Sequence, residues 1–423
     1  MILFQNVTAK IQLYSLRNDN THIPNLQPWT IAAFYFFIIL LFLKIYVKIE
    51  LWILVGEILK KNPCLFNEFL NAFLFRKNPV YLIQFVTERC NARCPHCFVD
   101  FKDKSGELSL EQIEKLASTS GNCLRNVALT GGEPFIREDL FEIADIWYQN
   151  STAQTISITT NGSMPDRIED FCKKASQKNI PVFFLFSYDF IGEKHSEYRR
   201  LKDLHINVMT SYEIVKKYSP KMSAMLQLTV SENNADSAFE TYNYMKNELG
   251  VKNINCSIVR GSNIDNAPEN VREKVGCAYE KLQSQIDKDF DLHELIGYTN
   301  RSLTSTILNA KNKILWKYVL KDFREGKYIS PCRAGELLGI IYSKGDIFPC
   351  EMLNKSFGNL KEFDYDFLKC WNSVNALNTR KLIKNDKCHC TYECAWLLNI
   401  LSTFQYYPEL FYYIIRNGLM RWI

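Results

Sequence analysis

The chain has 423 residues, 47% of them hydrophobic, and its 51 Lys and Arg against 46 Asp and Glu give a net charge of +5. This length is sufficient for two or three domains with substantial cores. So mild an excess of positive charge gives no case for nucleic acid as a partner. Fourteen cysteines would suggest disulfides in a small secreted protein, but several here stand in short clusters. That grouping favours metal binding in a reducing compartment.

Residues 1–79 form an N-terminal segment with a hydrophobic helix expected at about 29–47. The stretch from Trp29 to Leu43 is uncharged and apolar on every helical face. Extended to Val47, it would be about 28 Å long, close to the thickness of a bilayer core. Lys and Arg are more frequent after this stretch than before it, which favours an N-out, C-in orientation. We therefore expect a cytoplasmic protein attached to the cytoplasmic face of the membrane. The alternative is a buried or interfacial helix.

Between residues 80 and 275, short apolar runs alternate with helical patterns, which predicts an α/β fold with a parallel sheet covered by helices. Such a sheet curls into a full or partial barrel, with its chemistry at the carboxyl ends of the strands. The expected strands are 81–86, 126–129, 155–159, 182–186, 224–230 and 254–259. The expected helices are 109–120, 138–149, 164–178, 204–217 and 235–249. Ser109 and Gln112 have the spacing of a capping box at the first helix.

Cys90, Cys94 and Cys97 follow the first expected strand, and the run from Gly131 to Pro134 follows the second. Three thiolates this close together can bind three irons of a cubane cluster and leave the fourth iron open. An open metal position can bind a substrate or cofactor, which points to an enzyme. A zinc knuckle is the alternative, although zinc normally takes four ligands.

The spacing Cys-x3-Cys-x2-Cys, with His96 before the third cysteine, resembles the signature of the radical S-adenosylmethionine (SAM) superfamily. The Gly131-Gly132-Glu133-Pro134 run strengthens this resemblance. It implies a partial (β/α)6 TIM-type barrel and a [4Fe-4S] cluster whose open iron is chelated by SAM. It also implies that the glycine run meets the SAM amino group. In that family, reductive cleavage of SAM gives a 5'-deoxyadenosyl radical that abstracts a hydrogen atom from substrate.

The same resemblance makes further polar residues at strand ends candidates for SAM binding. Asn161 follows the third strand as a candidate for cofactor binding, and Ser187 and Asp189 follow the fourth as candidates for the SAM ribose or carboxylate. Arg199 is expected at the SAM carboxylate, and the backbone at Arg260 against the adenine. An ordinary role in a turn or cap is the alternative for each of them.

A helical connector is expected at 276–330, followed by a small cysteine-rich domain at 331–400 and an aromatic helix at 401–423. The run from Gly345 to Glu351 resembles the β-hairpin of SPASM and twitch domains, which hold auxiliary iron-sulfur clusters. Five cysteines are available in this domain: Cys332, Cys350, Cys388, Cys390 and Cys394. They can fully ligate one [4Fe-4S] cluster, expected on Cys332, Cys350, Cys394 and either Cys388 or Cys390. His389 is a weaker candidate ligand, and a structural zinc is the alternative to a cluster. The last helix is expected either on a membrane surface or packed in the core.

These features predict a membrane-associated radical SAM enzyme. Its auxiliary cluster would transfer electrons or bind a substrate that is a peptide, a sugar or alcohol, or lipid-linked. A reductase such as flavodoxin or ferredoxin is the expected electron donor. The alternative is a non-catalytic, membrane-associated iron-sulfur redox sensor. The remaining cysteines are expected as small buried hydrophobic residues: Cys64, Cys123, Cys172, Cys256, Cys277 and Cys370.

Overall fold

The computed structural model describes residues 71, 76–97, 106–296 and 303–420. Residues Asn67–Ile423 form one compact unit. The hydrophobic helix expected at 29–47 lies outside the described residues. Within the described ranges, no helix is both long enough and apolar enough to span a bilayer.

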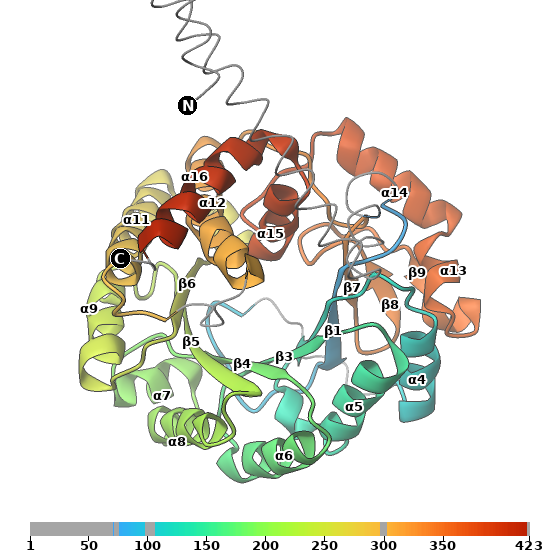
Figure 1. The fold of residues 1–423 in the computed structure, drawn as a ribbon, viewed down its shortest axis with the longest axis horizontal. Helices are drawn as coiled ribbons and strands as arrows, with labels where there is room; N and C mark the ends of the chain where they lie inside the picture. Colours follow the sequence, from blue (N-terminus) through green and yellow to red (C-terminus); the bar gives the residue numbers. More distant parts are fainter. Residues whose placement is uncertain (1–70, 72–75, 98–105, 297–302, 421–423) are drawn as a thin grey trace, which may run out of the picture. The chain divides into compact units, whose positions relative to one another are not determined.

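Six parallel strands form the body of the sheet, and they confirm the predicted partial barrel (Figure 1). Each strand pairs with the next one along the chain, because a helical segment on the outside returns the chain to the same edge. Their carboxyl ends therefore share one rim. The strands are β1 (Tyr81–Thr87), β2 (Asn126–Gly131), β3 (Thr155–Thr160), β4 (Val182–Ser187), β5 (Met222–Val230) and β6 (Ile254–Ile258).

Helices cover the outer face of these strands (Figure 1). At α4 the capping box forms as expected, since Gln112 N donates to Ser109 Oγ at 3.3 Å and Ser109 N donates to Gln112 Oε1 at 3.0 Å. The covering helices are α4 (Leu110–Ser118), α5 (Leu140–Asn150), α6 (Pro165–Gln177), α8 (Leu204–Lys216) and α9 (Ala238–Asn243), which continues as a π-helical turn, η3 (Tyr244–Glu248). Two short helices were not expected: α7 (Glu193–Arg199) and α10 (Ser262–Asp265).

The C-terminal part continues the same sheet instead of standing apart from it. Strand β7 (Leu338–Ile341) pairs in parallel with β1, and β8 (Asp346–Phe348) and β9 (Gly358–Asn359) add antiparallel strands. This pairing places the predicted hairpin directly beside the first strand of the barrel. As a result, the strand that leads into the first cysteine loop and the strands of the C-terminal cysteine region are joined in one sheet.

Helices close the gap between β6 and β7. Helix α11 (Glu269–Asp291) packs on β6, α12 (Leu303–Glu325) packs on α11, and α15 (Glu393–Leu401) packs on both α12 and β7. The aromatic tail forms α16 (Tyr407–Met420), which packs on α12 and buries Leu410 but exposes Tyr412 and Ile415. The remaining elements are η2 (Pro134–Ile136), η4 (Leu360–Phe363), α13 (Phe367–Trp371), α14 (Val374–Asn385) and η5 (Phe404–Tyr406).

Candidate functional site

The first cysteine loop leaves the carboxyl end of β1, at the rim where barrel chemistry is expected. Its thiols lie close enough to affect one another. The pKa of Cys90 is raised to about 11, mainly by burial and also by the negative charges of nearby Glu133, Cys94 and Cys97. Three soft thiol donors on one short loop match the donor set that an iron-sulfur cluster takes, and metal binding would displace their protons.

The glycine run after β2 lies directly against the start of this loop. Gly132 N donates to Thr87 O, and Glu133 N donates to Arg89 O, both at 2.8 Å. A Cβ at Gly131 would stand 2.0 Å from Thr87 O, and one at Gly132 would stand 2.1 Å from Arg89 O. No side chain fits at either position. The two glycines therefore allow the backbones of the two loops to touch.

Glu133 is buried, and its carboxylate binds groups of this chain. Its Oε1 accepts from Phe135 N at 3.1 Å and from Thr160 Oγ1 at 2.7 Å, and its Oε2 accepts from Asn161 N at 2.7 Å. Burial raises the pKa of Glu133, while these hydrogen bonds act to lower it. The side chain thus joins the end of β2 to the end of β3. One acceptor position remains on Oε2 for a further donor such as an ammonium group.

Asn161 connects the end of β3 to the cysteine loop. Its Nδ2 donates to Asn91 Oδ1 at 2.9 Å, and Asn91 Nδ2 donates to Ser163 Oγ at 2.9 Å. Asn91 stands between Cys90 and Cys94 in the sequence. Asn161, which the sequence predicts to bind the cofactor, therefore contacts the loop that would carry the cluster.

Asp189 and Arg199 form a buried ion pair beside the same loop. Asp189 Oδ2 accepts from Arg199 Nε at 2.8 Å and from Nη2 at 2.6 Å. Burial acts to raise the pKa of Asp189, but the charge of Arg199 leads the effects that lower it, and the pKa is lowered overall. Burial raises the pKa of Cys94, which the positive charge of Arg199 partly offsets. The pair therefore brings a fixed cation close to one of the three thiols.

Helix α7 provides two more contacts to the cysteine loop. The amide of Arg93 donates to the carbonyl of Arg199 at 3.0 Å. His96 Nδ1 lies 2.7 Å from the hydroxyl of Tyr198, and the two rings stack. Ser187 is the last residue of β4 and precedes Asp189 by two residues.

The side chain of Arg260 contacts the C-terminal part of the chain. Its Nη2 donates to Glu351 Oε2 at 2.7 Å, and its guanidinium lies 4.7 Å from the centre of the Tyr392 ring. From the sequence, the backbone at Arg260, and not its side chain, is expected to pack against the adenine. Its side chain joins the end of β6 to the C-terminal cysteine region.

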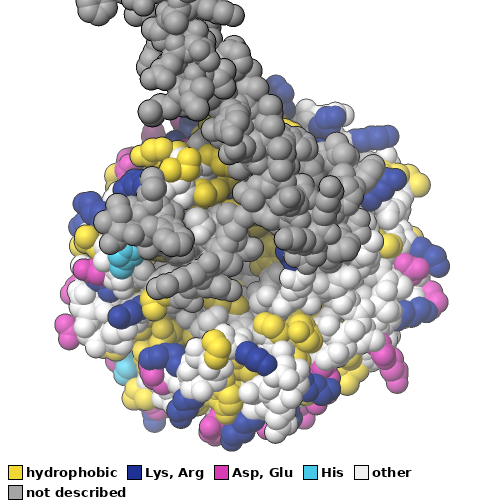
Figure 2. Space-filling model, in the orientation of Figure 1, with side chains coloured by type: hydrophobic (Ala, Val, Ile, Leu, Met, Phe, Trp, Pro, Cys, Tyr) yellow, Lys and Arg dark blue, Asp and Glu magenta, His cyan; other side chains and the backbone are white. Residues whose placement is uncertain are grey.

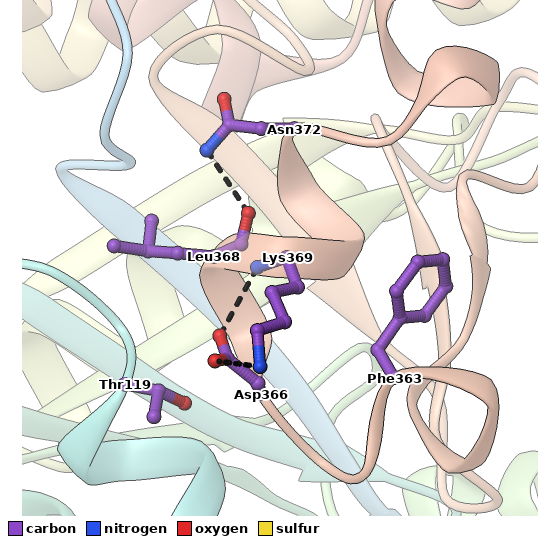
Figure 3. A pocket seen from close by; sticks show the side chains of 6 residues that line it. All are labelled: Thr119, Phe363, Asp366, Leu368, Lys369 and Asn372. Atoms are coloured by element: carbon purple, nitrogen blue, oxygen red, sulfur yellow. Dashed lines mark hydrogen bonds and ion pairs between the residues drawn. The ribbon is translucent and has the colours of Figure 1, made fainter.

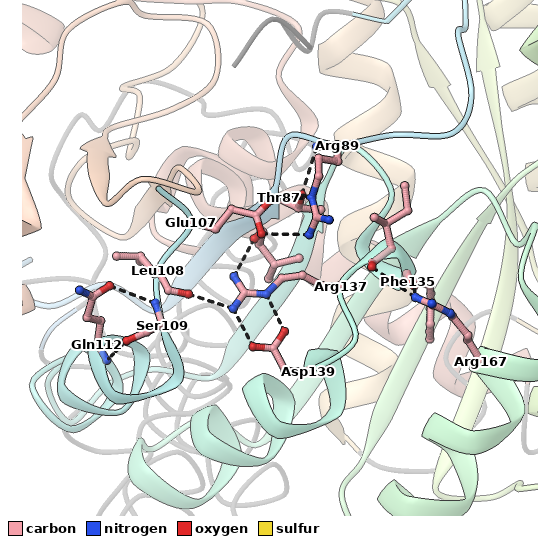
Figure 4. A network of polar contacts seen from close by, with 12 residues as sticks. Thr87, Arg89, Glu107, Leu108, Ser109, Gln112, Phe135, Arg137, Asp139 and Arg167 are labelled. Atoms are coloured by element: carbon pink, nitrogen blue, oxygen red, sulfur yellow. Dashed lines mark hydrogen bonds and ion pairs between the residues drawn. The ribbon is translucent and has the colours of Figure 1, made fainter. Parts of the chain in front are cut away.

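Sequence reasoning missed a polar network at the base of the cysteine loop (Figure 4). Arg137 donates to Val86 O at 3.0 Å and to Leu108 O at 2.9 Å, and it pairs with Asp139 at 2.7 Å. Arg89, the residue before Cys90, forms an ion pair with Glu107 at 3.1 Å. The sequence signal that could have indicated this network is Arg137, an arginine that closely follows the glycine run. The network fixes the backbone on both sides of the loop.

The C-terminal cysteines surround a cavity of about 220 Å³. Residues from four places in the chain line it, which brings together Cys332, Cys350, Cys388 and Cys390. His389 also lines the cavity, and its Nδ1 lies 3.1 Å from Asp322 Oδ1. Cys394 is absent from the lining. Its pKa is raised to about 12 by burial and by Glu351, whereas Arg260 acts to lower it. Four thiols around one cavity are the number of donors that a cubane cluster takes.

A second cavity, of about 580 Å³, lies on the outside between α4 and α13 (Figure 3). None of the predicted site residues lines it. Within the described ranges, no three His, Cys, Asp or Glu side chains converge on a site for a single metal ion. Of the scattered cysteines, Cys64 lies outside the described residues and Cys277 is exposed, contrary to expectation. Burial is confirmed for Cys123, Cys172, Cys256 and Cys370.

Known proteins resemble the chain most clearly in its barrel. Residues 85–240 match the family model of the radical SAM superfamily. Molybdenum cofactor biosynthesis protein 1 of Bos taurus is 33% identical over 158 residues, which is 34% of this chain but only 25% of that protein. Fe-coproporphyrin III synthase of Methanosarcina barkeri is 25% identical over 367 residues, 76% of this chain and 85% of that protein. The structure of anSMEcpe with bound AdoMet aligns with a TM-score of 0.53 at 20% identity, covering 80% of this chain and 97% of that one.

Proposed function

Because residues 85–240 match the model of the radical SAM superfamily, we propose that the chain binds a [4Fe-4S] cluster on Cys90, Cys94 and Cys97 and cleaves SAM reductively. The observation that carries this proposal is the convergence of the cysteine loop, the glycine run and the Asp189–Arg199 pair on one rim of the barrel. When bound to these three cysteines, the cluster would supply the electron for reductive cleavage of SAM and so the chemistry for hydrogen abstraction from a substrate.

The residues of this chain would hold the reactants in place. The backbone contacts between the glycine run and the loop fix the three thiols relative to the end of β2. Glu133 offers its remaining acceptor position to the SAM ammonium group. Arg199 keeps a positive charge at the loop, which favours the thiolate form of Cys94. This electrostatic support would be in place before SAM binds.

The proposal extends to an auxiliary cluster in the C-terminal cavity. Four thiols line that cavity, which is the number that fully ligates a cubane. A fully ligated cluster has no open iron for substrate, so electron transfer is its proposed role. The four proposed ligands are Cys332, Cys350, Cys388 and Cys390, and Cys394 is left out of the set expected from sequence.

A SAM-cleavage assay tests the main proposal. Anaerobically reconstituted protein with SAM and dithionite should release 5'-deoxyadenosine, and Cys94→Ala should abolish that release. Cys172→Ala, which changes a buried thiol on α6, is the matched control and should keep it. A wild-type chain that carries its full cluster yet releases no 5'-deoxyadenosine would instead support the redox sensor.

The substrate is sought among peptides, sugars or alcohols, and lipid-linked molecules. Candidates labelled with deuterium should transfer the label into 5'-deoxyadenosine only when the reacting C–H bond carries it. A candidate that is consumed without transfer is not the direct hydrogen donor.

We also propose that residues 29–47 attach the enzyme to the cytoplasmic face of the membrane. The support is the uncharged stretch from Trp29 to Leu43 and the basic residues that follow it. Removal of residues 1–48 should release the protein from membranes into the soluble fraction. Unchanged sedimentation with membranes would contradict this attachment.

A further inference from the structure

One face of helix α14 is exposed and has a distinct chemistry. Val374 and Leu377 are 71% and 49% exposed, and Lys381 and Lys384 follow at the spacing that keeps them on the same helical face. Lys387, just beyond the helix, is also exposed. None of the three lysines forms an ion pair with a carboxylate in the described part of the chain. The face thus combines an apolar part with three lysines, and the exposed Asp386 lies between two of them in the chain.

The end of α14 is joined directly to the wall of the cysteine cavity. Cys388 N donates to Ile383 O at 3.0 Å, and Lys387 N donates to Lys384 O at 3.4 Å. These two bonds have the Schellman pattern, which fixes the chain as it leaves a helix. Cys388 and the partly exposed His389 line the cavity only one and two residues after Lys387. The basic face therefore ends within two residues of the cavity lining.

Lys387 occupies a position that normally favours glycine. Its φ is 49°, in the left-handed region, at the point of the Schellman pattern where Gly has no steric penalty. A lysine there costs about 1 kcal/mol relative to glycine. Backbone preference therefore does not explain the lysine at this position.

We infer that this face of α14 is the docking surface for a small acidic one-electron carrier protein that exchanges electrons with the group held in the cysteine cavity. The inference rests on the proposed auxiliary cluster. Weak electron-transfer complexes use small contact areas, with an apolar centre and charged residues that steer the encounter. In each exchange the reduced cluster loses one electron, the oxidised carrier gains it, and no bond forms or breaks. Figure 2 shows Lys and Arg side chains along the rim where α14 lies.

Charge reversal tests the docking surface. The holoprotein is reduced and mixed with an oxidised acidic [2Fe-2S] ferredoxin, and the second-order rate is measured at several salt concentrations. Lys381→Glu, Lys384→Glu and Lys387→Glu together should slow the exchange at least about tenfold at low salt and remove most of its salt dependence. A matched control reverses three other exposed lysines without ion pairs in the described structure, Lys217, Lys252 and Lys288. The control should leave the rate near that of the wild type.

Iron content and the spectrum of the second cluster are measured on every variant, and the experiment is repeated in a Cys94→Ala chain so that only the cavity cluster reports. A chain that holds no second cluster would remove the auxiliary part of the proposed function, and this inference with it. Two clusters with an unchanged rate, or equal slowing in the control, would overturn the docking surface alone. If the lysines instead control binding to anionic phospholipid vesicles and leave the ferredoxin rate unchanged, the face meets a membrane and the inference is wrong.

Discussion

The amide of Arg93 donates a hydrogen bond to the backbone carbonyl of Arg199 across 3.0 Å. Arg93 lies inside the cysteine loop, and Arg199 is the last residue of α7. The side chain of Arg199 is in turn held by Asp189, so one residue anchors the loop through its backbone and through its charge. The geometry of the three thiols therefore depends on a helix that follows β4, far along the chain.

Removal of the Asp189 charge should destabilise the protein and disturb the loop. In Asp189→Asn, Arg199 stays buried without its counter-charge, at a cost of about 3–5 kcal/mol. The free energy of unfolding by denaturant gives the value. The double variant Asp189→Asn/Arg199→Met should lose less than the sum of the single changes. Strict additivity would mean that the two side chains are not energetically coupled.

Glu133→Gln tests the connection between β2 and β3. An amide NH2 would replace one oxygen that now accepts from a backbone or hydroxyl donor, so at least one buried donor loses its partner. We expect a loss of about 1–3 kcal/mol in thermal unfolding and weaker binding of SAM. Glu138→Gln, at an exposed neighbouring position, is the control. Equal effects of the two changes would contradict a special role for Glu133.

Gly132→Ala should disrupt the contact between the glycine run and the cysteine loop. The new methyl would overlap the carbonyl oxygen of Arg89, so the loops must separate. Reconstituted iron at the first site and SAM cleavage should both fall at least about tenfold, since small displacements of reacting groups are costly. Gly276→Ala on α11 meets its nearest neighbour at 3.4 Å and should be tolerated. Full activity in Gly132→Ala would show that the close approach is not needed.

Serine replacements should identify the ligands of the auxiliary cluster. Reconstituted wild-type protein should hold about eight irons per chain, four for each cubane. Cys388→Ser and Cys390→Ser should each weaken or remove the second cluster, whereas Cys394→Ser should keep it. Electron paramagnetic resonance and iron analysis read out the result. Loss of the cluster in Cys394→Ser would restore the set expected from sequence.

Asp287 on α11 should make stability depend on pH. Burial raises the pKa of Asp287 from 3.8 to about 6. The folded protein therefore binds this proton more tightly than the unfolded chain, and about 1–3 kcal/mol of stability is lost as the pH rises from 4 through 6. Asp287→Asn should be more stable than the wild type at pH 7 and should lack this slope. Glu240→Gln, at an exposed carboxylate, should leave the profile unchanged; a similar profile in both variants would rule Asp287 out.

The sequence alone determined the barrel and the chemistry of its first loop. Apolar runs such as Tyr81–Val86 have the short length and the β-branched and aromatic residues typical of a buried strand, so strand positions follow from local pattern. The cysteine spacing and the glycine run also act locally, because the residues that work together are neighbours in the chain. The capping box at Ser109 was visible for the same reason.

Only the tertiary structure decided which distant side chains meet. The pairing of Asp189 with Arg199, the path of the Arg260 side chain to Glu351, and the choice of Cys390 over Cys394 at the cavity depend on how helices and strands pack. Spacing in the sequence does not encode these contacts, because a one-residue change in a helix turns a side chain by about 100°. Cys390 and Cys394 are equivalent as donors in the sequence. In the fold, Cys390 precedes α15 and lines the cavity, whereas Cys394 lies in the first turn of α15, where the charge of Arg260 acts on it.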